Sequence, residues 1–157
     1  MGIEEKLFGS WELESFAIDY DDGGREYPLG EDAVGLIAYT REGIFAGQMM
    51  ARGRPKFPRN STAEKTSGTD GQVRAAFDGY VAYYCNFEVD EERGIVNHRV
   101  IAGLLPDWEG RLNVRHYAFE GDDRLILRTP HMLINDRSGH SRLVWRRLPV
   151  KYPGGLR

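Results

Sequence analysis

The chain has 157 residues, of which 41% are hydrophobic and 29% are charged, and its formal net charge is −3. This length fits one domain over residues 1–157, and the composition is that of a folded globular protein, with no apolar run near the roughly 20 residues that span a bilayer. The charge gives no reason to expect a nucleic acid or an anionic membrane as a partner, and the single cysteine, Cys85, excludes an internal disulfide.

The first part of the chain predicts three strands. Its acidic start, MGIEEKLFGS, lacks the basic and apolar regions of a signal peptide, so we expect a cytoplasmic protein. Apolar and polar residues then alternate from Ser10 to Ile18, and Gly23 and Gly24 can supply the positive φ of the tight turn that follows. The segments AVGLIAYT and IFAGQMM form a predicted hairpin with Gly43 at its turn.

The long segment 51–79 carries a basic stretch and the one helix that the sequence predicts. The stretch ARGRPKFPR contains Arg52, Arg54, Lys56 and Arg59, which indicates either a solvated loop or a segment that attracts an anionic ligand. The polar residues NSTAEKTSGTD can then cap a short helix through about GQVRAAFD, whose apolar residues share one helical face.

Five more strand-like runs complete the chain: GYVAYYCNFEVD, GIVNHRVIAGL, RLNVRHYAFEG, DRLILRTP and SRLVWRRL. The connections between the first four are short and turn-like, so antiparallel neighbours are expected. Sequential strands of this kind indicate an up-and-down barrel or a sandwich, and closure removes the exposed edges of the sheet. We therefore predict an all-β fold, an antiparallel up-and-down barrel of about eight strands with one short helix.

The order and spacing of several blocks carry a family resemblance: GSWELESF, YPLGEDAVGLIAYTREGIFAGQMM, FDGYVAYYCNFEVD, VNHRV, PDWEGRLNVRHYAF, DRLILRTP and SRLVWRR. Together they resemble the lipocalin-like domain proteins of bacteria and fungi, small relatives within the calycin barrels. The resemblance implies an antiparallel barrel around a cavity for a small apolar molecule. It also implies that Trp11 packs across the closed end of the barrel, beneath Arg146 or Arg147 of the last strand.

Two residues are candidate catalytic groups. Alternate residues of a barrel strand point inward, and His98 shares the more apolar face of its strand, where an imidazole is a candidate general acid or base. The alternative is a buried histidine that is bonded to a tyrosine or to the backbone. The resemblance places Arg115 inside, where it needs a partner such as a carboxylate or a ligand carbonyl; the alternative places it on the outer wall.

Six further residues are candidate ligand contacts. Gln48 and Met50 share one face of their strand, and an inward Gln48 could bond a ligand carbonyl while Met50 adapts to an irregular shape. The two faces of the strand at 80–89 are nearly tied, and we expect Tyr84 inside. The remaining candidates are Tyr39, Tyr117 and Trp108, the last of which either covers a barrel mouth or holds its turn together.

The motifs exclude several chemistries and leave three functions open. No HxH, HExxH or paired-cysteine motif is present, so we expect no metal or other cofactor. The first function is binding of a small hydrophobic ligand, by a monomer or a homodimer. The second is a cofactor-independent cyclase, isomerase or dehydratase, in which His98 moves a proton and Arg115 or Gln48 holds a developing oxyanion. The third is a filled barrel that acts through its surface.

Overall fold

The computed structural model describes residues 2–58 and 68–152. The strands are β1 (Gly9–Tyr20), β2 (Arg25–Glu26), β3 (Val34–Tyr39), β4 (Ile44–Met50), β5 (Tyr80–Asp90), β6 (Ile95–Gly103), β7 (Leu112–Glu120), β8 (Arg124–Arg128), β9 (Met132–Ile134) and β10 (Arg137–Arg147). The helices are α1 (Ile3–Leu7), α2 (Asp70–Asp78) and the 3₁₀ helix η1 (Pro106–Trp108). The predicted strands and the predicted helix are confirmed, whereas α1, η1 and the short strands β2 and β9 were not expected.

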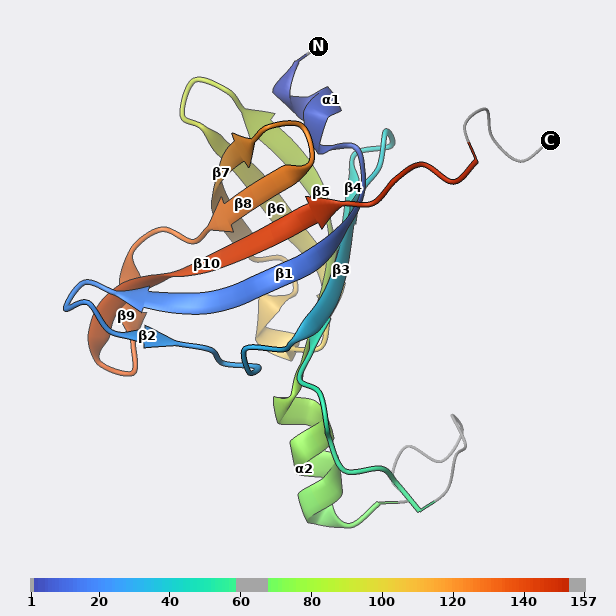
Figure 1. The fold of residues 1–157 in the computed structure, drawn as a ribbon, viewed down its shortest axis with the longest axis vertical. Coiled ribbons are helices and arrows are strands. Elements are labelled where there is room, and N and C mark those ends of the chain that lie inside the picture. The colour runs from blue at the N-terminus through green and yellow to red at the C-terminus, as the bar shows by residue number, and fades with distance from the viewer. Residues whose placement is uncertain (1, 59–67, 153–157) are drawn as a thin grey trace.

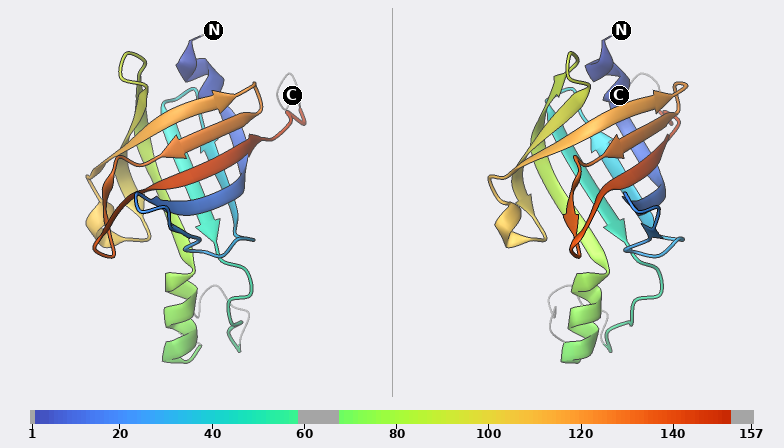
Figure 2. Two further views of the ribbon diagram at one scale, coloured as in Figure 1. Left: turned by 60° about the vertical axis from the view of Figure 1, so that its left-hand side comes forward. Right: turned by 90° about the vertical axis from the view of Figure 1, so that its left-hand side faces the viewer.

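Eight strands close into an antiparallel barrel (Figures 1 and 2). They follow the order β1-β3-β4-β5-β6-β7-β8-β10, and β10 pairs back onto β1. The short strands β2 and β9 pair with the end of β1 and the start of β10, so both extend the wall at the same end of the barrel. Closure leaves no long edge strand exposed, which confirms the predicted barrel over the sandwich.

Inward side chains fill one half of the barrel with a continuous apolar core. Paired residues on neighbouring strands share a face, so Ile37 lies inside with Trp11, and Phe45 lies inside with Tyr39 and Cys85. All five are at most 3% exposed. The core also contains Leu7, Leu13, Phe87, Val96, Leu125, Leu127 and Trp145.

One end of the barrel is sealed by Trp11 and an arginine from the last strand. Helix α1 lies at this end (Figure 1), and its Leu7 carbonyl accepts a 2.9 Å hydrogen bond from the indole nitrogen of Trp11. The guanidinium of Arg147 lies 4.0 Å from the centre of the Trp11 ring and donates 2.8 Å to the carbonyl of Phe8. Of the two arginines that the resemblance allowed, Arg147 takes this position, while Arg146 is exposed on the surface.

Helix α2 projects from the opposite end of the barrel (Figures 1 and 2). A capping box starts it, because the Thr69 side chain accepts from the backbone of Gln72 and the Gln72 side chain accepts from the backbone of Thr69. Thr69 therefore caps the helix as predicted, while residues 60–67 of the predicted capping segment lie outside the described residues. No helix in residues 2–58 and 68–152 is long and apolar enough to cross a membrane.

The basic stretch before α2 makes structural contacts. Arg52 donates 2.9 Å to the carbonyl of Asp32, and Arg54 donates 2.9 Å to the carbonyl of Ala76 in α2. Arg54 also lies over the ring of Tyr80. Two of these cations thus tie the segment to the barrel and to α2, whereas Arg59 lies outside the described residues.

We predict that Arg147→Met lowers the free energy of unfolding by about 2–4 kcal/mol, because it removes charged hydrogen bonds and the cation over the Trp11 ring. Denaturant unfolding followed by tryptophan fluorescence measures the change. The matched control is Arg146→Met, which breaks an exposed ion pair with Glu12 at 2.7 Å and should cost less than about 1 kcal/mol. Equal losses in the two variants would contradict the assigned role of Arg147.

Candidate functional site: the barrel cavity

The other half of the barrel encloses a cavity of about 380 Å³, which is in the range of small-molecule binding sites. Most of its wall is apolar, with side chains that include Phe16, Met49, Val81, Leu127 and Leu143. The polar side chains that line it include Tyr83, His98, Asn113, Arg115, Thr129 and Ser141. Arg111 and Met132, which are exposed, mark the rim where the cavity meets solvent.

A glycine on β4 keeps this half of the barrel open. Gly47 pairs with Ile37 and Tyr83, so a side chain at this position would point inward. A Cβ atom there would lie 2.8 Å from the ring of Phe45 and 2.9 Å from Ile37, which is closer than real Cβ contacts. Glycine therefore lets these side chains pack closely and leaves the space beyond them free.

Two tyrosines hold His98 at the inner wall of the cavity. The hydroxyl of Tyr39 lies 2.9 Å from Nε2 of His98, and the hydroxyl of Tyr83 lies 2.9 Å from Nδ1. The ring of Phe45 stacks on the imidazole with centroids 4.2 Å apart. His98 is completely buried, so the alternative in which it bonds to a tyrosine is the one that the structure adopts.

Tyr39, His98 and Tyr83 form a hydrogen-bonded array that leaves the hydroxyl proton of Tyr83 directed toward the cavity. A neutral imidazole has one donor and one acceptor nitrogen, so one tyrosine donates to His98 and the other accepts from it. Tyr39 is 1% exposed, and His98 is its hydroxyl partner among the described residues, so its proton is satisfied by donation to Nε2. Nδ1 then donates to Tyr83, whose own hydroxyl proton is free for a group in the cavity.

Burial keeps all three members of the array neutral. Desolvation lowers the pKa of His98 well below its usual value, and the nearby charge of Arg115 lowers it further. Desolvation also raises the pKa of Tyr83 to about 12, although Arg115 opposes that rise, and it raises the pKa of Tyr39. The array is therefore uncharged near pH 7 and acts through hydrogen bonds.

Other hydrogen-bond donors face the same space. Nδ2 of Asn113 and Nε1 of Trp145 are buried and have no hydrogen-bond partner among the described residues, and both residues line the cavity. Arg115 donates 2.8 Å to the backbone carbonyl of Val114, and no described carboxylate forms an ion pair with it. A buried donor without a partner costs about 1–3 kcal/mol, so this wall favours a ligand that carries hydrogen-bond acceptors.

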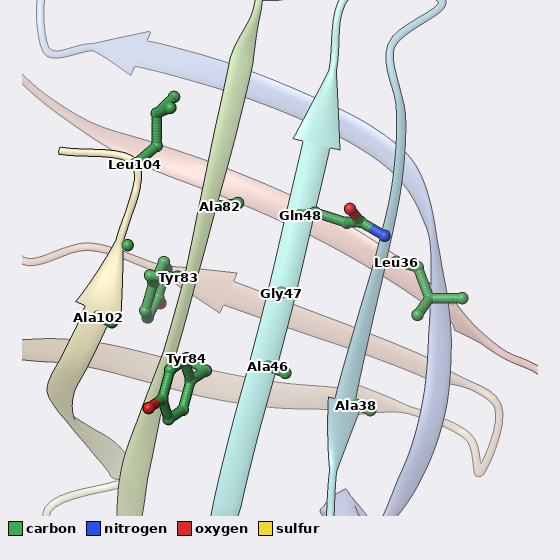
Figure 3. A pocket seen from close by; sticks show the side chains of 11 residues that line it. Leu36, Ala38, Ala46, Gly47, Gln48, Ala82, Tyr83, Tyr84, Ala102 and Leu104 are labelled. Atoms are coloured by element: carbon green, nitrogen blue, oxygen red, sulfur yellow. The ribbon is translucent and has the colours of Figure 1, made fainter. Parts of the chain in front are cut away.

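The structure corrects the predicted inward orientation of Gln48, Met50 and Tyr84. These side chains lie on the outer face of β4 and β5, where Gln48 accepts from the Tyr80 hydroxyl and Tyr84 is 44% exposed. Gln48 is also among the residues that line the cavity, whereas Met50 and Tyr84 are not. Figure 3 shows Gln48 and Tyr84 beside a shallow outer depression that is lined largely by small residues. The inner face of β4 carries Phe45, Gly47 and Met49, and the glycine removes the apolar side chain that would have identified that face.

The remaining sequence candidates occupy three different positions. His98, Arg115 and Trp108 line the cavity, and Trp108 contacts the ring of Tyr83 edge-on with centroids 5.4 Å apart. Tyr39 lies behind His98, within the core. Tyr117 points inward beside Phe119, at the filled half of the barrel rather than in the cavity wall.

Sequence reasoning missed six cavity residues that carry polar atoms: Tyr83, Arg111, Asn113, Thr129, Ser141 and Trp145. Tyr83 alternates with Cys85 and Phe87, which is the apolar set of its strand, and this parity was the available signal. Asn113 shares the inward face of its strand with Arg115. Nothing in the local sequence marks Thr129, because β8 ends one residue earlier, at Arg128. The inward position of Thr129 depends on its contact with Ser141 of β10.

Metal-ligating side chains do not gather in the described residues. No group of three or more histidine, cysteine or acidic side chains there could hold a metal ion. The two closest histidines, His131 and His140, have ring centroids 5.0 Å apart, and His131 pairs with Asp21 at 3.1 Å on the surface.

A closed eight-stranded antiparallel barrel with one sealed end and an internal cavity defines the lipocalin-like class of proteins. The family model described as "Lipocalin-like domain" matches residues 8–148, so the chain belongs to this family. Among curated proteins, the chain is similar to the 4'-hydroxy-3'-methoxypropiophenone carrier protein of Aspergillus oryzae. The two are 33% identical over 103 residues, which cover 61% of this chain and 92% of the relative.

We predict that His98→Gln weakens the pH dependence of stability. Since the pKa of His98 is lowered in the folded state, its contribution is complete above its unfolded pKa of about 6.5 and is lost as the pH falls below that value. The wild-type free energy of unfolding should fall by up to about 1.4 kcal/mol per pH unit more steeply than that of the variant. Urea unfolding at pH 7.5, 6.5 and 5.5 measures both curves.

The control for this experiment is His116→Gln, which changes an exposed histidine on the outer face of β7. It should keep the wild-type slope between pH 7.5 and 5.5. Parallel curves for the wild type and His98→Gln would show that burial of the imidazole does not couple folding to protonation.

Proposed function

We propose that this protein binds a small, largely apolar molecule inside the barrel and orients it through a hydrogen-bond acceptor on that molecule. The observation that carries the proposal is the cavity of about 380 Å³, in which an apolar wall surrounds a few convergent donors. Such a combination is typical of small-molecule sites, because apolar area supplies affinity and a few polar groups supply orientation. Tyr83 and Asn113 are the proposed contacts to a ligand carbonyl or hydroxyl.

The relative in Aspergillus oryzae supports this proposal, because its name describes a carrier of an aromatic ketone. A ketone oxygen accepts hydrogen bonds and donates none, which matches the donors at Asn113 and Trp145. Transport or storage of a ligand requires a binding site with one accessible mouth, and we place that mouth at Trp108, Arg111 and Met132. We extend the class of ligand, a small aromatic carbonyl compound, to this chain as part of the proposal.

Binding can be tested with prodan, a neutral fluorescent aromatic ketone whose emission shifts to the blue in an apolar site. The wild type should bind it saturably. Val81→Phe adds a ring to the cavity wall and should weaken the affinity at least tenfold, or about 1.4 kcal/mol. Fluorescence titration measures the dissociation constant.

The matched control is Ala82→Phe, which adds the same ring on the outer face of β5. It should leave the affinity within about twofold of the wild type, a difference of about 0.4 kcal/mol. Failure of the wild type to bind prodan or smaller aromatic ketones, or equal weakening by both variants, would contradict an internal site.

A second candidate function is cofactor-independent proton transfer, which the contact between Tyr83 and His98 favours. Both ring nitrogens of His98 are occupied by tyrosine hydroxyls, so Tyr83 rather than His98 would touch the substrate. In this function Tyr83 would give its hydroxyl proton to the ligand oxygen and its oxygen would take up a proton from the ligand carbon, while the Nδ1–H of His98 would stabilise the transient phenolate by a hydrogen bond. Arg115 would stabilise negative charge on the substrate oxygen.

This second candidate function predicts that the α-protons of a bound ketone exchange with solvent deuterium. If the array enolises a bound ketone, an α-proton of propiophenone leaves the carbon and a deuteron from D₂O replaces it, which proton NMR detects as loss of the methylene signal. Tyr83→Phe should reduce the rate at least tenfold while propiophenone still binds. Tyr84→Phe, which changes the adjacent outer tyrosine, should keep the rate. A wild type that binds propiophenone without exchange would exclude enolisation and leave the binding proposal intact.

A further inference from the structure

The charges that line the cavity are all of one sign. Arg115 lies within the barrel and Arg111 lies at the rim, and no aspartate or glutamate is among the described residues of the cavity wall. No described carboxylate pairs with either arginine. A half-buried guanidinium without a counter-ion is unfavourable unless its surroundings or a ligand supply negative charge.

The neighbouring polar groups reinforce this preference. Nδ2 of Asn113 and Nε1 of Trp145 can only donate. Because Nδ1 of His98 donates to the oxygen of Tyr83, the hydroxyl proton of Tyr83 is available as a third donor. Hydrogen bonds to an ionised acceptor are about twice as strong as those between neutral groups. Preorganised donors beside a fixed cation form the arrangement that stabilises an oxyanion.

We infer that the cavity takes up its ligand as an oxyanion: a small aromatic or unsaturated molecule whose ionised oxygen, from a phenol, an enol or a carboxylic acid, lies against Arg115, Tyr83 and Asn113. This inference rests on the proposed function of ligand binding. It adds the charge state of the bound molecule, which neither the family nor the named relative specifies.

The field of Arg115 reaches the groups around the oxyanion position. Arg115 contributes to lowering the pKa of His98, and it opposes the rise in pKa that burial causes at Tyr39, Tyr83 and Cys85. These are the effects of a positive potential that favours negative charge in the cavity. The same potential would lower the pKa of a bound acid.

The protein's own charges in the cavity stay constant near neutrality, so a pH titration reports on the ligand. The titratable and charged groups that line the site are Tyr83 on β5, His98 on β6, and Arg115 on β7 with Arg111 before it. Tyr39 on β3 and Cys85 on β5 lie behind them in the core. Burial holds the tyrosines and Cys85 protonated and His98 neutral.

The test uses 4-nitrophenol, which titrates near neutral pH and whose phenolate absorbs visible light. Bound 4-nitrophenol should have an apparent pKa lower by about one unit, so the anion should bind about tenfold more tightly than the neutral form. 4-Nitroanisole, its neutral methyl ether, should bind about tenfold more weakly than the phenolate. 4-Nitrobenzoate serves as a second anion, and the relative affinities of the two anions identify phenolate or carboxylate as the better acceptor.

Variants test which residues lower the pKa of bound 4-nitrophenol. Arg115→Met should abolish the pKa shift and retain binding of 4-nitroanisole, which also shows that the variant is folded. Tyr83→Phe should reduce the shift. The matched controls are Arg99→Met and Tyr84→Phe, which change exposed outer residues on β6 and β5 and should keep it. If Arg115→Met does not fold, the comparison of 4-nitrophenol with 4-nitroanisole on the wild type still decides the question.

The outcomes separate this inference from the proposed function. If 4-nitroanisole and both anions bind equally and the pKa of 4-nitrophenol is unchanged, the oxyanion inference is overturned and the binding function stands. If no small aromatic compound binds, including prodan, the proposed function fails and the inference fails with it. Preferential binding of either anion, lost in Arg115→Met, supports the inference.

Discussion

The contact between Arg147 and Trp11 joins the last strand to the first at the sealed end of the barrel, and the division of the interior depends on it. An eight-stranded barrel is just wide enough for its side chains to fill, so large residues at one end leave no space there. Trp11, Tyr39 and Phe87 occupy that half. At the other end Gly47, Thr129 and Ser141 present little or no side chain, and the unfilled volume collects between them. The cavity therefore lies at the end of the barrel that the large side chains do not fill.

Much of this fold could be predicted, because the strands of an up-and-down barrel follow one another along the chain and can be recognised from local sequence patterns. Period-two alternation and turn glycines such as Gly43 identified the strands, and closure follows from the lack of helices to cover a sheet. The orientation of β4 could not be predicted, because both of its faces carry apolar residues, whereas β5 had a signal in the apolar set of Cys85 and Phe87. Register between strands decides it: Gly47 pairs with Tyr83, and an irregularity after Tyr84 turns Ala102 outward while Val100 stays inside. Such pairing is a long-range property that a single strand does not encode.

The array of Tyr39, His98 and Tyr83 shows why a histidine inside a barrel need not be a direct catalyst. Each ring nitrogen is satisfied at 2.9 Å, and the stacked Phe45 excludes water from the imidazole. Leaving one of these groups unpaired would cost more than a hydrogen bond contributes, so the three residues specify one another's positions. The sequence pointed correctly to the position of His98, but the group that meets the cavity is Tyr83, which the alternation pattern of a nearly tied strand concealed.

The chemistry of the wall bears on whether the barrel retains or converts its ligand. Arg115, Asn113 and Trp145 present donors or positive charge, and no carboxylate base lies among the described residues of the wall. Groups that bind an oxygen already negative in the free ligand stabilise the ground state, which increases affinity and residence without lowering a barrier. Catalysis would require charge that develops only in the transition state, as in enolisation of a neutral ketone. The same donors therefore favour a carrier when the ligand arrives ionised, and Tyr83 with His98 becomes chemically useful when the ligand arrives neutral.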